Sequence, residues 1–164
     1  MKVFRYAKLI VAGLAVAAVS GCSSVNSKVG GMLGFETDLT LKLIAEADIN
    51  PDDKNRPSPL FIRLYELKST RQFERANFID LYERDKEVLG ADMVAKQTLK
   101  RLQPGDTRKD KLVLNRETRY VGLVAEFLQY QKAKFKVVIP VSSENVIASS
   151  SVVRITGNVI NVGE

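Results

Sequence analysis

The sequence predicts a mainly β protein: an antiparallel β-sandwich of about seven to eight strands with a short helical insert between the second and third strands. Three features predict this fold. Apolar and polar residues alternate in successive short segments from residue 37 onward, turn-forming residues separate these segments, and residues 69–92 change to helical spacing. The 164 residues suffice for one such domain, which we expect over residues 37–164.

Residues 1–21 predict a cleaved secretory signal peptide. Lys2, Arg5 and Lys8 precede an apolar run over residues 9–19. This run is too short to cross a bilayer, because a spanning helix needs about 20 apolar residues. A basic start, a short apolar run and small residues after it are typical of a signal peptide. A buried amphipathic helix is the less favoured interpretation, because the run has no polar face.

The end of this segment resembles a bacterial lipobox. Residues 19–22 read Val-Ser-Gly-Cys, and Cys22 is the one Cys of the chain. The resemblance implies a lipid on the Cys22 thiol, cleavage before Cys22 and acylation of the new N-terminus, for example with palmitate. Two or more acyl chains give stable anchoring that a single chain does not. In lipoproteins with Ser after the modified Cys, as with Ser23 here, the outer membrane is favoured. The alternative is a secreted protein with a free thiol.

Residues 22–36 predict the lipidated Cys22 followed by a flexible tether. The segment is rich in Ser and Gly, which favour an irregular chain. Fully extended, it reaches at most about 50 Å. Its Gly30, Gly31 and Gly34 do not form a phosphate loop, because no strand precedes them and no Lys-Ser/Thr pair follows.

The first two strands and the loop between them follow the tether. Residues 37–45 alternate between apolar and polar side chains and predict a half-buried strand. Residues 48–59 contain three Pro, which cannot donate to a strand ladder, and therefore predict a loop. Residues 60–67 are apolar on both faces and predict a central strand.

Residues 69–92 predict the helical insert. Phe78, Leu81, Tyr82 and Leu89 fall roughly at helical spacing, and Gly90 is placed to end the last turn. The insert is rich in carboxylates. We favour a solvated helix face over a catalytic pair, because spacing alone identifies no such pair.

Further strands are expected after the insert. The alternation predicts them at residues 93–102, 107–114, 119–128 and 134–141, and one more over 153–159 after the Ser-rich stretch 142–151. The sequence Gln103-Pro104-Gly105-Asp106 is typical of a type II turn, in which Gly accepts a positive φ. Turn signals between short strands favour an antiparallel sandwich over a parallel sheet.

The composition argues against most catalytic and metal sites. The chain has no His, so the commonest general base and metal ligand are missing. One Cys cannot form an intrachain disulfide or a zinc cage. Asp48, Asn50 and Asp52 resemble the start of a calcium loop, but the sixth position is Asp53 instead of Gly, and the twelfth is Pro59 instead of Glu. We therefore expect no catalytic residue, no metal and no cofactor apart from the covalent lipid on Cys22.

The net positive charge of the chain is only weak evidence for nucleic-acid binding. Of the net charge of +6, the predicted signal peptide carries three bases and no acid, so the mature chain has +3. Residues 96–119 hold eight bases: Lys96, Lys100, Arg101, Arg108, Lys109, Lys111, Arg116 and Arg119. Nucleic acid is disfavoured because no aromatic residues interleave with them. We favour solvent-facing positions that protect strand edges, and an electrostatic patch for an acidic partner stays open.

One family shows these features in the same order. After the lipobox and the tether come Ile62-Arg63-Leu64-Tyr65-Glu66-Leu67, an insert with Phe73, Phe78, Leu81-Tyr82, Asp85 and Leu89-Gly90, then Leu102-x-Pro104-Gly105 and residues 120–127 (YVGLVAEF). The set, over about residues 37–162, resembles the outer-membrane lipoproteins of type VI secretion systems, the TssJ (SciN) family.

The resemblance implies a fold, a location and partners. It implies a transthyretin-like sandwich that is not an enzyme, is lipid-anchored in the outer membrane and faces the periplasm. It implies binding to the C-terminal periplasmic region of the inner-membrane protein TssM, and through it to TssL, with multiple copies in a trans-envelope complex for protein secretion. Partner binding in the family involves the loop between the first two strands. We carry this over to Ile49, Asn50, Pro51, Asp52, Asp53, Lys54, Asn55 and Arg56. The prolines of this loop restrict the free ensemble and so reduce the ordering cost of binding.

Two other functions remain as alternatives. An envelope lipoprotein that binds a glycan or other small ligand is compatible with a sandwich, although the chain has no Trp to stack on a sugar. A transthyretin-like hydrolase is compatible with the fold, but that chemistry depends on His.

Overall fold

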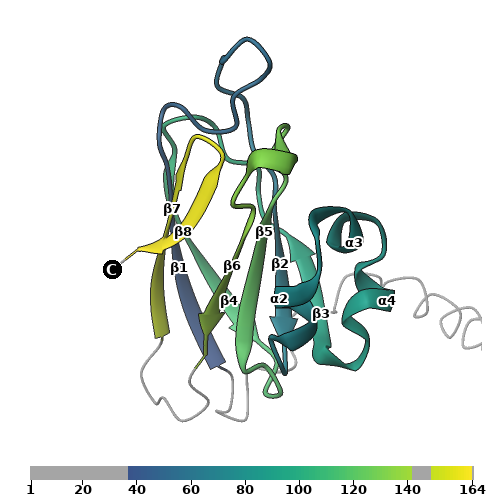
Figure 1. Cartoon of the computed structure of the whole chain (residues 1–164). Coiled ribbons are helices and arrows are strands. Elements are labelled where there is room, and N and C mark those ends of the chain that lie inside the picture. The colour runs from purple at the N-terminus through teal and green to yellow at the C-terminus, as the bar shows by residue number, and fades with distance from the viewer. Residues whose placement is uncertain (1–36, 142–148, 164) are drawn as a thin grey trace, which may run out of the picture. The chain divides into compact units, whose positions relative to one another are not determined.

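Two four-stranded sheets face each other in the computed structural model, which describes residues 37–141 and 149–163 (Figure 1). Sheet 1 has the order β4 (Thr107–Leu114), β1 (Thr37–Ala45), β7 (Ser149–Thr156) and β8 (Val159–Gly163). Sheet 2 has the order β3 (Met93–Thr98), β2 (Ile62–Leu67), β5 (Tyr120–Ala125) and β6 (Lys136–Pro140). The predicted signal peptide, Cys22 and the tether lie outside the described residues.

The main core fills the space between the two sheets. Leu39, Leu41 and Leu43 of β1 point inward and are at most 1% exposed, as the alternation predicts. Leu64 and Leu123 meet them from sheet 2. Full burial of each such side chain stabilises the fold by about 1.5–3 kcal/mol. The predicted sandwich is confirmed.

A second core lies on the outer face of sheet 2, beneath the predicted insert. The insert consists of α2 (Arg71–Arg75), α3 (Phe78–Glu83), α4 (Asp85–Leu89) and the short 3-10 helix η2 (Gly90–Asp92). Its side chains Phe73, Phe78, Leu81 and Leu89 pack with Tyr65, Leu67 and Val124 of the sheet. Helices as short as these are not stable in isolation, so packing against the sheet stabilises them.

Gly122 allows this packing. A Cβ atom at Gly122 would lie 2.7 Å from Cζ of the Phe73 ring. From the neighbouring strand β6, the Lys136 ammonium group donates to the carbonyl oxygens of Phe73, Glu74 and Ala76 at 2.9, 2.8 and 2.6 Å. These carbonyls lie in and just after α2, where a helix leaves acceptors without partners. The contacts fix the insert to β5 and β6.

The C-terminal strand differs from the sequence prediction. Instead of one strand over 153–159, β7 and β8 form a hairpin in which Thr156 pairs with Val159. Gly157, with φ 52°, supplies the positive φ that a two-residue hairpin turn requires. The strand β7 begins within the Ser-rich stretch and pairs with β1 in parallel, whereas the other neighbouring strands are antiparallel.

Other local predictions hold. Gly105 has φ 84°, and the Asp106 N–H donates to the Gln103 carbonyl at 3.1 Å, as in the expected type II turn. The helix α4 ends at Leu89, and Gly90 follows with φ 48°. Within residues 37–141 and 149–163, no helix is long and apolar enough to cross a membrane.

Candidate functional site

The loop between β1 and β2 extends from one end of the sandwich (Figure 1). It contains all eight predicted partner-binding residues, but their side chains divide into two groups. Ile49 is fully buried in the main core, and Asn50 is 2% exposed. Neither side chain is exposed in this arrangement, and both hold the loop in place; partner contact at these two residues stays a prediction.

Asn50 fixes the base of the loop. Its side-chain Nδ2 donates to the Pro59 carbonyl at 2.8 Å, and its Oδ1 accepts from the Leu128 N–H at 2.8 Å. Its own N–H donates to the Gly157 carbonyl at 2.8 Å. The backbone at Asn50 has φ 49°, a left-handed conformation that Asn tolerates better than most residues. Through its side chain and its backbone N–H, this one buried residue joins the β1–β2 loop, the β5–β6 connection and the β7–β8 turn.

Asp52 organises the tip of the loop. One carboxylate oxygen accepts from the N–H groups of Lys54 and Arg56 at 2.8 and 2.9 Å. The other accepts from Nε of Arg56 at 2.8 Å. The hydrogen bond from the Arg56 side chain is the main reason that the pKa of Asp52 lies below its usual range. The tip therefore has a defined conformation in the free protein.

The exposed part of the loop faces a second connection. Asp53, Lys54, Asn55 and Arg56 are exposed. A hollow of about 490 Å³ is lined by Asp53 and Asn55 together with Leu128, Gln129, Tyr130, Gln131 and Lys132, the connection between β5 and β6. We call residues 53–56 and 128–132 the loop surface.

The β5–β6 connection is the part of this surface that the sequence analysis missed. Gln129 Nε2 donates to the carbonyls of Pro51 and Asp52 at 3.2 and 3.1 Å. The side chain of Leu128 is 59% exposed, so an apolar residue projects beside the charged tip. The available signal was the polar break Gln129-Tyr130-Gln131 directly after an apolar strand.

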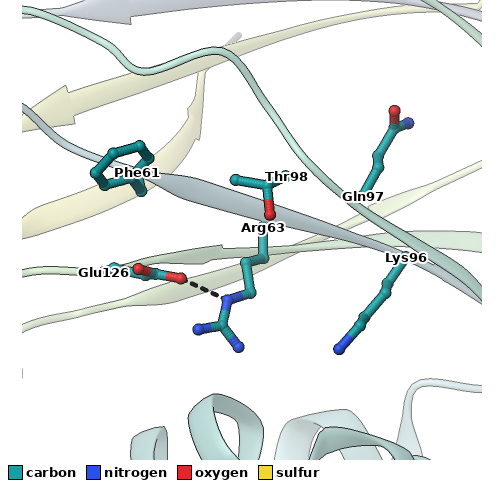
Figure 2. A pocket seen from close by; sticks show the side chains of 6 residues that line it. All are labelled: Phe61, Arg63, Lys96, Gln97, Thr98 and Glu126. Carbon is teal, nitrogen blue, oxygen red and sulfur yellow. Dashed lines mark hydrogen bonds and ion pairs between the residues drawn. The ribbon is translucent and has the colours of Figure 1, made fainter.

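A second hollow, of about 520 Å³, lies on the outer face of sheet 2 (Figure 2). Figure 2 shows Phe61 and Glu126 on one side of Arg63 and Lys96 on the other. Arg63 Nε lies 2.5 Å from Glu126 Oε1, and the guanidinium group lies 4.5 Å from the centre of the Tyr82 ring. Lys96 Nζ lies 2.6 Å from Asp85 Oδ2. The charges around this hollow already have partners, so it offers no group poised for chemistry.

The buried polar cluster beside it is structural for the same reason. The Tyr65 hydroxyl oxygen lies 3.1 Å from both Asp85 Oδ2 and the Leu81 carbonyl oxygen, and its single O–H is shared between these two acceptors. Burial raises the pKa of Tyr65 to about 12. Burial also raises the pKa of Asp85, but hydrogen bonds from Lys96 and Tyr65 outweigh it and leave the pKa below the usual range. Tyr65 is fully buried, so no substrate reaches this pair.

The loop surface combines exposed charged side chains with the exposed apolar side chain of Leu128. Among the described residues, no group of three or more His, Cys, Asp and Glu side chains is placed to hold a metal ion. The predicted lipidation residue, Cys22, lies outside the described residues and stays a prediction. The same holds for partner binding by the loop.

Comparison with known proteins gives one family. The family described as "Type VI secretion lipoprotein, VasD, EvfM, TssJ" matches residues 37–158. No curated protein matches the chain.

Solved structures give the same fold. The structure of the type VI secretion lipoprotein TssJ1 from Pseudomonas aeruginosa is 28% identical with a TM-score of 0.72, covering 78% of this chain and 95% of that one. Lip from Serratia marcescens, described as a membrane bound component of the type VI secretion system, is 22% identical with a TM-score of 0.69, covering 79% and 97%. A chain of a structure described as a type VI membrane complex is 25% identical with a TM-score of 0.67, covering 78% and 98%.

Proposed function

Because the chain belongs to the family of type VI secretion lipoproteins, we propose that it is the outer-membrane subunit of a type VI membrane complex. In this proposal a lipid on Cys22 holds the sandwich at the periplasmic side of the outer membrane. The loop surface binds the C-terminal periplasmic region of a TssM-like inner-membrane protein, and through it TssL. The family is a secretion component and not a family of enzymes, so the role is assembly and anchoring.

The observation that carries this proposal is the placement of the loop at the end of β1 that lies away from Thr37. The strand β1 begins at Thr37, 15 residues after Cys22, and ends at Ala45, just before the loop. A strand of nine residues is about 30 Å long. The anchor therefore enters at one end of β1 and leaves the loop surface at the other end free for a partner.

The structure of the loop supports binding at low entropic cost. Asn50 and Asp52 fix the base and the tip through hydrogen bonds to Pro59, Leu128, Lys54 and Arg56. A loop that is ordered before binding loses less conformational entropy when it binds. Its exposed charges lie beside Leu128 and Tyr130, and an apolar centre with a polar rim is the usual composition of a protein interface.

The anchoring half of the proposal is tested by Cys22→Ser. We expect this variant to lose metabolic labelling with palmitate and to leave the outer-membrane fraction of a density gradient, whereas the neighbouring control Ser24→Ala keeps both. A Cys22→Ser chain that is still labelled and still fractionates with the outer membrane would contradict lipidation at this residue. The binding half is tested by the affinity of the TssM periplasmic region for variants of the loop surface.

A further inference from the structure

The outer face of sheet 1 is open, and three lysines gather on it. In the described part of the chain, the insert helices pack on sheet 2, so sheet 1 has no helix against its outer face (Figure 1). Because Leu39, Leu41 and Leu43 point inward, the alternate residues of β1, including Lys42, point outward. Strand pairing sets Lys42 directly opposite Lys109, and Thr40 opposite Lys111. The three ammonium groups therefore occupy neighbouring positions on two adjacent strands.

These lysines lack counter-charges within the described residues. Within the described residues, the side chains of Lys42, Lys109 and Lys111 form no hydrogen bond and no ion pair. In contrast, two other bases of the same sequence segment are paired: Lys96 with Asp85, and Arg108 with Asp110. Like charges directly opposite each other on paired strands destabilise a sheet. An external anion would remove this repulsion.

We propose that this face docks on the anionic lipid surface of the membrane that anchors the chain. The inference rests on the proposed anchor at Cys22 and adds an orientation of the domain to it. The strand that carries Lys42 is the strand that follows the tether in the sequence, and the five residue-to-residue steps from Thr37 to Lys42 span about 17 Å. A tether of this length keeps the face at a high effective concentration near the bilayer.

The shape and chemistry of the face suit a bilayer. Each lysine near an anionic leaflet strengthens binding by about 1 kcal/mol, which corresponds to about fivefold. Val113, on the same strand as Lys109 and Lys111, is 60% exposed and can contact the lipid headgroup region. Asp38, near the N-terminal end of β1, lies opposite Val113 and forms no ion pair with the three lysines among the described residues. The hollow of Figure 2 lies on the other sheet, so docking leaves it open.

The test uses the lipidated protein in vesicles and an introduced thiol. Because Cys22 is the only Cys and its thiol carries the lipid, Val113→Cys gives one free thiol for a fluorescent donor. Energy transfer to a headgroup-labelled lipid reports the distance of this face from the bilayer. We expect strong transfer in vesicles containing phosphatidylglycerol and weak transfer in pure phosphatidylcholine or at high salt, which screens charges. Lys42→Gln, Lys109→Gln and Lys111→Gln together should weaken docking by about a hundredfold and abolish the difference.

A matched label separates the outcomes. Glu87→Cys, on the exposed part of α4, carries the same donor on the opposite side of the domain and should stay far from the bilayer in both lipids. Equal transfer from the Val113→Cys label in both lipids, with the protein still membrane-bound, would overturn the docking but not the anchor. Binding of soluble polyglutamate to the protein, together with transfer that is no stronger with phosphatidylglycerol than with pure phosphatidylcholine, would overturn it in favour of an acidic protein partner. Loss of the protein from both kinds of vesicle would instead contradict the anchor.

Discussion

The side-chain oxygen of Asn50 accepts a hydrogen bond from the backbone N–H of Leu128, 78 residues further along the chain, at 2.8 Å. This contact joins the β1–β2 loop to the β5–β6 connection, and these two segments line one hollow. The loop surface therefore depends on a side chain that is itself buried.

Replacing Asn50 should destabilise the protein and loosen this surface. Asn50→Ala leaves the partly buried Leu128 N–H without its acceptor, which costs about 1–3 kcal/mol, and places Ala at φ 49°. We expect a loss of about 3 kcal/mol in the free energy of unfolding, measured in urea. Asn55→Ala is the matched control, because Asn55 has φ 58° but is exposed. Equal losses in the two variants would show that the buried hydrogen bonds contribute little.

The packing of Phe73 against Gly122 predicts a compensating pair. Gly122→Ala should lower stability by about 1–3 kcal/mol, because its Cβ would overlap the Phe73 ring. Combining it with Phe73→Leu removes part of the ring and should recover some of this loss. Thermal unfolding of both single variants and the double variant gives the coupling energy. Strict additivity of the two changes would contradict the close contact.

The ion pair between Asp85 and Lys96 predicts a pH dependence. The pKa of Asp85 in the folded protein lies below its ordinary value of 3.8. A lowered pKa means that the carboxylate stabilises the fold above this pH and that the contribution disappears as the pH falls through the folded value. Asp85→Asn should therefore cost about 2 kcal/mol at neutral pH. The difference in the free energy of unfolding between this variant and the unmodified protein, measured in urea, should disappear at the lowest pH where the protein still folds. A gap that does not change with pH would contradict this assignment.

The hydrogen bonds of Lys136 should hold the insert against the sheet. Lys136→Met keeps the apolar stem but removes the donor to three carbonyls around the end of α2. We expect faster amide hydrogen exchange in residues 71–76 and a loss of about 2 kcal/mol. Lys86→Met, on the exposed side of the insert, is the control and should change neither quantity. Unchanged exchange in the Lys136 variant would show that apolar packing alone holds the insert.

The elements of the fold were predictable where local pattern decides. Leu39, Leu41 and Leu43 alternate with polar residues, which predicts that one face of β1 is buried. Gly105, after Pro104, predicts the turn before β4. The division of 153–159 into two strands was missed because the alternation continues through Gly157 and Asn158 without a break in polarity. The parallel pairing of β1 and β7 was missed because the chain forms sheet 2 before it returns to sheet 1, and no local pattern encodes the direction in which it returns.

The loop surface was only half predictable. The prolines and charges of residues 48–59 indicate an exposed loop, but the sequence does not separate the buried Asn50 from the exposed Asn55. The contribution of Leu128 and Gln129 follows from contacts nearly 80 residues apart, which only the folded chain brings together.

We propose that the loop surface binds the periplasmic C-terminal region of TssM. The most direct test is the dissociation constant of that region for the lipoprotein and for the double variant Lys54→Ala, Leu128→Ala, which alters both halves of the surface. We expect the affinity to fall by about tenfold or more with an unchanged melting temperature. The matched control Lys86→Ala, Ile79→Ala, on the exposed face of the insert, should bind as tightly as the unmodified protein. An unchanged affinity of the loop variant, or an equal loss in the control, would contradict the claim.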